Sequence, residues 1–487
     1  GLVMRPFGAL VFGKVGDSHG RKGAFLISIS VLGLATFAIG LLPTADQIGI
    51  WAPVALVLLR VLQGFALGGE YGGAAIYVAE HADHDKRGAA TGWIQVAAAI
   101  GLVGALGVIL ITRTLMGEEA FMAWGWRIPF LLSVVLLGIS LWIRIQLQES
   151  PAFQRLKDEG SVSKASLAES FLQWRNLKIV LLCLFGLMMG QGVSWYTTHF
   201  YAPVFIERIL KVPQLTVNEL MITVVALSAP LYVFFAWLSD KVGRKPVMLF
   251  GMVLYTAFTF PAYHLLTHAS NPALDAAQRA APVVVLADPA DCSFQLDLTG
   301  GAHQFKSSCD IAKGALANGG VNYSNAAGPA GAPAQVHIGG QIVVESVSAE
   351  GLNAAQTRSL RQSFEARLKA ALAEAGYPAT ADPAHFDFWL NFAVLFILVI
   401  AATALYGPMA AALVELFPTR IRYTALSLPY NVGTGWFGGL LPPTVFAIST
   451  ATGNIYSGLW FPVAVTGVCA IICLLFWPET KNRDIHA

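Results

Sequence analysis

Three ionisable residues, Arg5, Arg60 and Glu70, lie inside long apolar stretches. A charged side chain in the middle of a membrane helix costs about 2.5–3.5 kcal/mol, so such residues usually serve ion or solute movement. Arg5 precedes Lys14 by nine residues and Glu70 precedes Glu80 by ten. At about 1.5 Å per residue, both lie roughly 14 Å from the same end of their helices. We expect Arg5 and Glu70 to form an ion pair that couples protons to solute; a permanent structural pair is the alternative.

A short charged motif occurs twice in the chain. Gly16–Lys22 (GDSHGRK) and Ser239–Lys245 (SDKVGRK) each join two apolar segments, and in both the Asp and Arg side chains can pair across the helix ends. A second charged pair also recurs, each time at a separation of seven residues: Glu80 with Arg87, and Glu415 with Arg422. Repeated halves are typical of secondary transporters, in which one helical bundle rocks against the other around a central site.

The composition of the chain indicates a lipid environment. Of the 487 residues, 55% are apolar and 12% are charged, whereas a soluble protein carries about 25% charged residues. Ten segments are long and apolar enough to cross a membrane: Gly23–Pro43, Trp51–Ala79, Ala89–Ile111, Ile128–Ile143, Ile179–Ile206, Leu220–Ser239, Pro246–Thr267, Phe388–Val414, Tyr423–Thr452 and Ile455–Trp477. Residues 1–13 are apolar but too short to cross.

Other classes of protein find little support in the sequence. The net charge of +2 gives no reason to expect a nucleic-acid partner. We find no metal-spaced His cluster, nucleophile motif or phosphate-binding glycine loop. We therefore expect no enzyme, no cofactor and no metal site.

Lys and Arg residues are concentrated in one set of connections between the apolar segments. Such basic connections mark the cytoplasmic side of a membrane protein. The short connections on the opposite side carry only Arg113, Arg127, Arg208 and Lys211. The cytoplasmic set has eighteen members: Lys14, Arg21, Lys22, Lys86, Arg87, Arg144, Arg155, Lys157, Lys164, Arg175, Lys178, Lys241, Arg244, Lys245, Arg420, Arg422, Lys481 and Arg483.

The spacing of the repeated motifs predicts how the chain is organised. Asp17 precedes Glu80 by 63 residues but Asp240 precedes Glu415 by 175, so the second half holds an insertion. Only sixteen residues precede Asp17, and we expect an amino-terminal truncation of a twelve-helix protein that lacks the first helix and part of the second. The expected regions are an N-terminal helical half (1–147), a cytoplasmic central loop (148–178), the first part of the C-terminal half (179–267), a periplasmic inserted domain (268–386), and the remaining C-terminal half with a cytoplasmic tail (387–487).

The insertion is polar and rich in Ala and Gly, and we expect a small α+β domain. Val283–Leu286 and Val336–Val347 have the composition of strands, and leucines and a phenylalanine recur every four residues in Leu352–Ala375, which predicts an amphipathic helix. Because the periplasm is oxidising, we expect Cys292 and Cys309 to form a disulfide, with two free thiols as the alternative. Gating, solute capture and partner contact all remain open as roles for this domain.

Six short strings, together with the doubled charged motif, resemble the metabolite:proton symporter family of the major facilitator superfamily. The strings are Arg5–Gly8 (RPFG), Gln63–Gly73 (QGFALGGEYGG), Trp124–Phe130 (WGWRIPF), Glu149–Pro151 (ESP), Leu416–Tyr423 (LFPTRIRY) and Pro478–Thr480 (PET). The resemblance covers everything except the insertion. It implies two six-helix halves, here without the first helix, that import organic acids or zwitterions such as proline and betaine together with protons.

Two groups of residues take their roles from this resemblance. Arg60 precedes Gln63 and Gly64 in a pattern that is linked to proton transfer in the superfamily. The alternative is that the Arg60 side chain extends toward the outer membrane surface. The repeated charged residues would form a gate that stabilises one access state, whereas basic anchoring in the membrane is the alternative. These residues are Asp17, Arg21, Asp240, Arg244, Glu80, Arg87, Glu415 and Arg422.

Polar and aromatic residues are dense in the expected seventh, tenth and eleventh helices, as in the lining of a solute cavity. The candidates are Gln191, Tyr196, Tyr406, Tyr430 and Asn431, with a place in the aromatic belt at the membrane surface as the alternative. We therefore expect an all-α membrane protein of the major facilitator fold with a small α+β insertion, in the bacterial inner membrane.

The expected function is secondary active import of a small carboxylate or zwitterion by proton symport with alternating access. The partners would be the organic solute, protons and the lipid bilayer. A membrane sensor on a transporter scaffold and a proton-independent facilitator are the alternatives.

Overall fold

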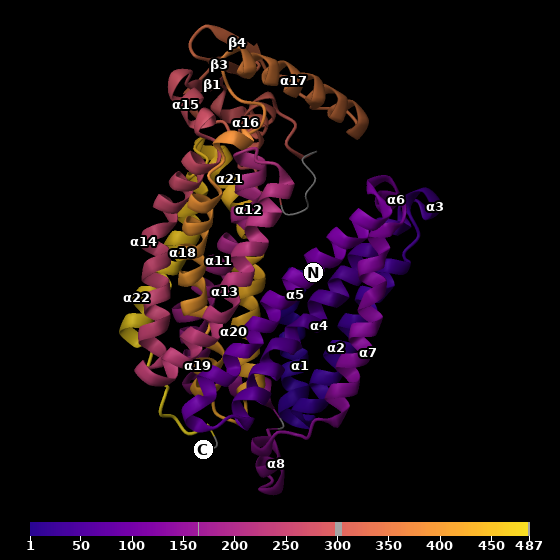
Figure 1. Cartoon of the computed structure of the whole chain (residues 1–487), viewed down its shortest axis with the longest axis vertical. Helices are drawn as coiled ribbons and strands as arrows, with labels where there is room; N and C mark the ends of the chain where they lie inside the picture. The colour runs from indigo at the N-terminus through magenta and orange to yellow at the C-terminus, as the bar shows by residue number, and fades with distance from the viewer. Residues whose placement is uncertain (164, 298–303, 486–487) are drawn as a thin grey trace.

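The computed structural model describes residues 1–163, 165–297 and 304–485. Lys164, which we counted among the cytoplasmic basic residues, lies outside them. Within the described residues, nine helices are long and apolar enough to cross a membrane. Two helical bundles stand side by side, and a small domain sits on one of them (Figure 1). The expected fold class, an all-α membrane protein with a small α+β insertion, is confirmed.

The N-terminal bundle begins with a helix that is longer than the apolar segment 1–13. α1 continues to His19, so Asp17 and its neighbours are helical. With 15 residues, α1 is still shorter than a full membrane span. The elements of this bundle are η1 (Leu2–Met4), α1 (Arg5–His19), α2 (Arg21–Leu41), α3 (Ala45–Ile48), α4 (Trp51–His81), η2 (His84–Lys86), α5 (Arg87–Met116), α6 (Glu118–Ala123), η3 (Gly125–Arg127) and α7 (Ile128–Gln146).

The C-terminal bundle contains one long run of α-helical and π-helical turns and one broken span. The predicted span Tyr423–Thr452 is wrong as a single helix, because Pro442 and Pro443 lack the N–H groups that would continue the hydrogen-bond ladder. The elements are α10 (Trp174–Cys183), η4 (Leu184–Met188), α11 (Met189–Tyr196), η5 (Thr197–Tyr201), α12 (Ala202–Val204), η6 (Phe205–Ile209), α13 (Gln214–Val242), α14 (Arg244–Ser270), α18 (Phe388–Tyr406), α19 (Met409–Leu416), α20 (Arg422–Asn431), η10 (Val432–Gly438), α21 (Leu441–Thr452), η11 (Ser457–Leu459) and α22 (Trp460–Phe476).

The connection between the bundles contains two short helices, α8 (Pro151–Asp158) and α9 (Ser166–Phe171). The fifth membrane-length helix begins at Trp174, five residues before the boundary expected from the sequence. The central loop therefore ends earlier than residue 178.

Both copies of the charged motif are tight turns between helices. Only Gly20 (φ 118°) separates α1 from α2, and only Gly243 (φ 108°) separates α13 from α14. These φ values lie in a region that favours glycine, since a side chain would be strained there. The turns place the Asp and the Arg of each motif on adjoining helix ends.

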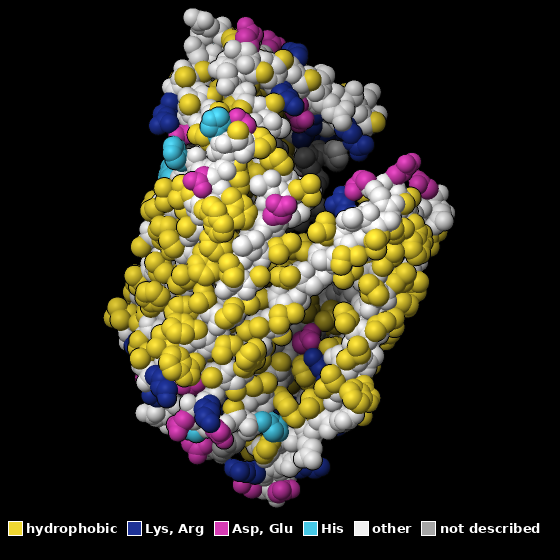
Figure 2. All heavy atoms as spheres, viewed as in Figure 1, with side chains coloured by type: hydrophobic (Ala, Val, Ile, Leu, Met, Phe, Trp, Pro, Cys, Tyr) yellow, Lys and Arg dark blue, Asp and Glu magenta, His cyan; other side chains and the backbone are white. Residues whose placement is uncertain are grey.

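The two bundles meet at one end and diverge toward the other (Figure 1). We call the end with the Gly20 and Gly243 turns the closed end, and the end with the inserted domain the open end. At the open end a cavity of about 460 Å³ separates α5 and α6 from the first turns of α13. A broad apolar band covers both bundles between more polar ends (Figure 2), as lipid contact requires.

The inserted domain is a four-stranded mixed sheet, ordered β2-β1-β3-β4, with three helices. β1 is parallel to β2 and antiparallel to β3. The predicted strand Val336–Val347 is wrong as a single strand, because the left-handed Gly339 and Gly340 turn the chain into a hairpin. The elements are α15 (Pro272–Ala280), β1 (Val283–Ala287), η7 (Pro289–Asp291), α16 (Ser308–Asn318), β2 (Tyr323–Ala327), β3 (Gln335–Ile338), β4 (Ile342–Glu345), α17 (Ala354–Glu374) and η9 (Pro383–His385).

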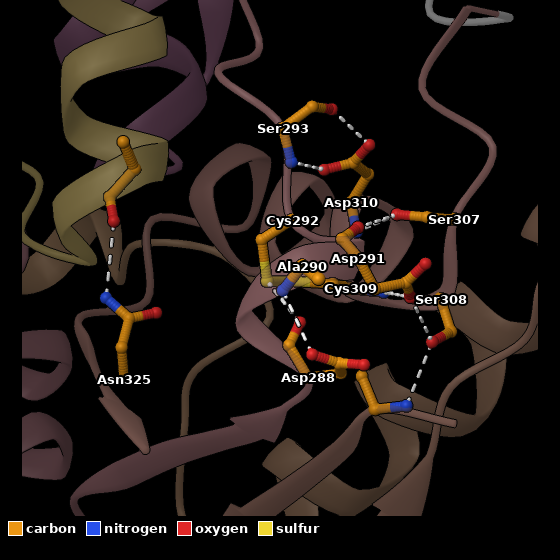
Figure 3. Close-up of a disulfide and its surroundings, with 12 residues drawn as sticks. Asp288, Ala290, Asp291, Cys292, Ser293, Ser307, Ser308, Cys309, Asp310 and Asn325 are labelled. Atoms are coloured by element: carbon orange, nitrogen blue, oxygen red, sulfur yellow. Dashed lines mark hydrogen bonds between the residues drawn. A yellow bond between two sulfur atoms is a disulfide. The ribbon is translucent and has the colours of Figure 1, made fainter. Parts of the chain in front are cut away.

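A disulfide between Cys292 and Cys309 ties the segment after β1 to α16 (Figure 3). The two Cα atoms are 5.2 Å apart. Beside the disulfide, the Asp310 carboxylate accepts hydrogen bonds from the Ser293 backbone (2.8 Å) and hydroxyl. The Ser307 hydroxyl in turn accepts one from the backbone N–H of Asp310 at 3.1 Å. The bridge and these bonds hold the start of α16 in place.

The inserted domain is fixed to the C-terminal bundle on two sides. After α21, Gly453 O accepts a hydrogen bond from the backbone of Tyr323 (2.7 Å), and the backbone N–H of Ile455 donates to Asn322 Oδ1 (2.9 Å). Before α13, Lys211 O accepts one from the backbone of Ala381 (3.0 Å). The domain is thus anchored through backbone groups to the connections at the open end of this bundle.

Candidate functional site

At the closed end, a buried carboxylate of the N-terminal bundle binds arginines from both bundles. Glu80, near the end of α4, pairs with Arg21 at the start of α2 and with Arg422 at the start of α20 (2.6 Å). The three side chains are at most 2% exposed. Arg21 also donates to the backbone carbonyl of Thr419 in the other bundle (3.0 Å). We call Arg21, Glu80 and Arg422 the first charge cluster.

The second charge cluster, Arg87, Arg244 and Glu415, repeats this arrangement with the bundles exchanged. Glu415 on α19 accepts hydrogen bonds from Arg244 of its own bundle (2.9 and 3.2 Å) and from Arg87 at the start of α5 (3.1 Å). These side chains are also at most 2% exposed. In each cluster, the carboxylate binds one arginine of its own bundle and one of the other.

The aspartates of the two motifs cap helices of the opposite bundle. Asp17 accepts hydrogen bonds from two backbone N–H groups at the start of α20 (2.9 and 3.1 Å), and Asp240 from two at the start of α5 (both 2.8 Å). A carboxylate there satisfies free N–H groups and the positive end of the helix dipole. Asp240 also pairs with Arg244 (2.6 Å). Among the described residues Asp17 makes no such pair with Arg21, which binds Glu80 instead.

Two further carboxylates at the closed end were missed in the sequence. Glu149 accepts a hydrogen bond from the backbone of Arg21 (3.2 Å), and Glu479 accepts one from the backbone of Arg244 (2.9 Å). Each therefore caps the helix that follows a motif turn. The available signal was the shared Glu of the ESP and PET strings, one after the last helix of each bundle.

Nearer the middle of the molecule, residues of both bundles form a polar and aromatic site. Arg5 Nε donates to Asn431 Oδ1 (3.0 Å), which links α1 to α20. The ring of Tyr71 on α4 stacks on Tyr430, with centroids 3.8 Å apart, and the Tyr430 hydroxyl lies 3.0 Å from that of Tyr406. Arg5 and Tyr71 remain partly exposed, whereas the other three are buried. We call these five residues the cross-bundle site.

Residues of α11 extend the cross-bundle site. The Trp195 ring lies 6.3 Å from that of Tyr406, and Tyr196 lies beside Arg5. Gln191, one helical turn before Trp195, is 2% exposed, and its Oε1 has no hydrogen-bond partner in the described chain. The structure thus gathers four of the five sequence candidates around Arg5, with Gln191 on the helix that carries Tyr196. Tyr71 was missed, because the prediction for this glycine-rich string considered only Glu70, the residue before it.

The expected ion pair between Arg5 and Glu70 is wrong. Glu70 pairs with Arg144 of α7 (3.3 Å), and the Arg144 guanidinium lies 3.6 Å from the centroid of the Phe25 ring. The two charged side chains are 25% and 16% exposed. Arg144 is one of the basic residues that the sequence assigns to the cytoplasmic side, and its long side chain extends along the apolar helix surface to reach Glu70. Arg5 is instead bound by Asn431 of the other bundle.

Arg60 stands apart from these groups. It is exposed and donates to Gln63 Oε1 (3.2 Å), whose amide donates to Thr36 Oγ1 (2.7 Å). Ten residues of helix place it about 15 Å from Glu70. The structure therefore does not bring Arg60 together with the other two proton-coupling candidates.

The chain is similar to known membrane transporters. A family described as sugar (and other) transporters matches residues 2–174 and 159–286, which together are more than half of the chain. The chain belongs to this family. It is therefore a multi-pass membrane protein of a transporter family.

Two relatives give a closer comparison over part of the chain. The proline/betaine transporter of Escherichia coli (strain K12) is 36% identical over 279 residues. The glycine betaine/proline/ectoine/pipecolic acid transporter OusA of Dickeya dadantii (strain 3937) is 36% identical over 274 residues. Each match covers 54% of this chain and 54% of the relative. The chain thus spans about half the length of the curated relatives it matches.

A solved structure supports the fold over the whole chain. The proton:xylose symporter XylE, bound to 6-bromo-6-deoxy-D-glucose, aligns with 100% of this chain and 86% of its own, with a TM-score of 0.61 and 14% identity. At that identity, the likeness shows the major facilitator fold alone. The resemblance to a major facilitator transporter, drawn from the short strings, is confirmed.

Proposed function

We propose that this protein imports a small zwitterionic or carboxylate-bearing solute by proton symport, with alternating access between its two bundles. The observation that carries the proposal is the cross-bundle site, where Arg5 of one bundle meets Asn431 of the other beside stacked tyrosines. A site shared by two bundles changes its access when one rocks against the other. The relatives are named for proline and betaine, which combine a carboxylate with a cationic nitrogen.

The chemistry of the cross-bundle site suits such a zwitterion. The Arg5 guanidinium offers charge-assisted hydrogen bonds to a carboxylate. The partly exposed rings of Tyr71 and Trp195 offer faces to a cationic nitrogen, an attraction of about 0.5–2 kcal/mol. The unpartnered Gln191 Oε1 adds an acceptor on the same helix as Trp195. We assign the carboxylate end of the solute to Arg5 and the cationic end to the rings.

In this proposal the closed end is the cytoplasmic gate, shut in an outward-facing state. Opening it separates Arg422 from Glu80 and Arg87 from Glu415, and removes both aspartate caps from the opposite bundle. The basic connections favour the cytoplasm at this end. The disulfide of the inserted domain favours an oxidising compartment at the open end. The protein then lies in the bacterial inner membrane with its inserted domain in the periplasm.

Proton coupling is assigned to Glu70 with Arg144. Both side chains keep partial exposure, so a proton can reach the carboxylate. Protonation of Glu70 would remove the charge that binds Arg144 and free α4 from α7. The same helix carries Tyr71, which stacks on Tyr430, and Glu80, which binds Arg422. A shift of α4 would therefore reach both the solute site and the gate.

Uptake into proteoliposomes tests the proposed function. An inward proton gradient is imposed and the uptake of labelled proline, glycine betaine and succinate is recorded for the wild type and for Glu70→Gln. The control variant is Glu118→Gln, whose carboxylate forms an exposed ion pair far from the gate. Gradient-driven uptake of one solute, lost only in Glu70→Gln, supports symport. Equal uptake with and without the gradient would favour a facilitator, and binding without uptake would favour a sensor.

A further inference from the structure

A second cavity lies between the inserted domain and the open end of the C-terminal bundle. Its volume is about 540 Å³, within the range of about 300–1,000 Å³ typical of small-molecule sites. α17 and the end of α16 form one wall, and η6 with the chain that follows it forms the other. Lys and Arg side chains lie along the edge of the inserted domain that overhangs the gap between the bundles (Figure 2).

Three cations and one carboxylate line this cavity: Arg208, Lys211, Lys369 and Glu365. Within the described chain, none of the four forms an ion pair. The ammonium group of Lys211 donates to the backbone carbonyl of Pro378 at 3.0 Å, which leaves its charge uncompensated. The lining therefore carries a net charge of +2; Arg208, Lys369 and Glu365 are exposed, and Lys211 is partly buried.

The backbone holds Lys211 in this cavity at a cost. Its φ of 61° is the one positive value among the non-glycine residues that the structure describes. Such a conformation is uncommon for a side chain like lysine, and strain of this kind often marks a functional position. Two hydrogen bonds fix it, from Ala381 N to Lys211 O and from the ammonium to Pro378 O, both 3.0 Å. Burial, and then the nearby Lys369 ammonium, lower the pKa of Lys211, and an anion here would favour its charged form.

We propose that this cavity binds a small soluble organic anion that carries carboxylates. Arg208, Lys211 and Lys369 would bind the carboxylates, and the buried side chains of Leu368 and Tyr377 would contact the carbon skeleton. The site lies between the inserted domain and the C-terminal bundle and is separate from Arg5 and the cross-bundle site. Binding here does not depend on the proposed transport.

The experiment is a titration of the full-length protein with succinate, observed at its lysines. The lysines receive isotopically labelled methyl groups, which keep the positive charge, and the signals of Lys211 and Lys369 are assigned by their loss in Lys→Arg variants. We expect these two signals to shift saturably with succinate while that of Lys306, outside the cavity, does not. Arg208→Gln should weaken binding at least about tenfold, as expected for one lost charge-assisted contact. The shifts should persist in Arg5→Gln.

The matched control is Arg358→Gln, which removes an exposed α17 cation that does not line the cavity and should leave the titration unchanged. Three results would overturn the proposal. The first is that the two signals do not move, and the second is that all lysine signals drift together with ionic strength. The third is that, in nanodiscs of anionic lipid, both signals are already displaced and insensitive to succinate, which would assign the site to a lipid phosphate.

Discussion

Replacing Arg87 by Gln should weaken the closed end without leaving a buried charge unpaired. The ion pair of Arg87 joins the two bundles at 3.1 Å, and Glu415 keeps Arg244 (2.9 Å) and Thr480 (2.8 Å) after the change. One hydrogen bond between charged groups contributes about 1.5–3 kcal/mol, and about 1.4 kcal/mol is a factor of ten in an equilibrium constant. The equilibrium should therefore shift about 10- to 150-fold toward opening of this end.

Spin-label distances measure this shift directly. Labels on cysteines at His84 and Val242 stand on opposite bundles at the closed end, and both positions are exposed. Arg87→Gln should add a population of molecules with a longer distance between the labels. Arg87→Lys should show little of this population, because a single nitrogen of Arg87 donates to Glu415 and a lysine ammonium can replace it. Arg113→Gln, which breaks an exposed ion pair that solvent screens, should change nothing. Unchanged distances in Arg87→Gln would show that the pair between Arg87 and Glu415 does not hold the closed end together.

Three further predictions concern single contacts. Arg5→Gln should weaken binding of a carboxylate solute at least about tenfold by calorimetry; equal affinities would remove Arg5 from the site. Gly243→Ala should destabilise the protein by about 1–2 kcal/mol in thermal unfolding, because its φ is 108°. Gly104→Ala, with nothing within 4 Å of the added carbon, should not. Reduction of the Cys292–Cys309 bridge, which spans 17 residues, should cost about 3 kcal/mol and speed hydrogen exchange in α16; unchanged exchange would contradict this.

The repeated motifs allowed us to predict which charged residues recur in both halves, but not which partners they bind. Glu80 and Arg87 recur as Glu415 and Arg422 at the same spacing, and all four do lie in buried charge clusters. The spacing does not show that each of these two arginines binds a carboxylate of the opposite bundle. The exchange of partners depends on how the bundles meet, which is a long-range property of the fold.

The central site shows a similar limit. Depth along a helix placed Arg5 and Glu70 at one level, but depth does not fix the face of the helix on which a side chain lies. Glu70 binds Arg144, whose long side chain carries its charge away from its own backbone position. In the inserted domain, the Gly339–Gly340 turn was visible in the sequence, and the strand prediction overlooked it. The docking of Asn322 against the end of α21 had no local signal.

We propose that solute and proton move together through this protein. The most direct test loads proteoliposomes with a pH-sensitive dye, sets equal pH on both sides, and adds an outside excess of the solute that shows gradient-driven uptake. Downhill entry of the solute should acidify the lumen, and Glu70→Gln should abolish the acidification while solute exchange continues. Entry of the solute without any change of lumenal pH in the wild-type protein would contradict proton symport.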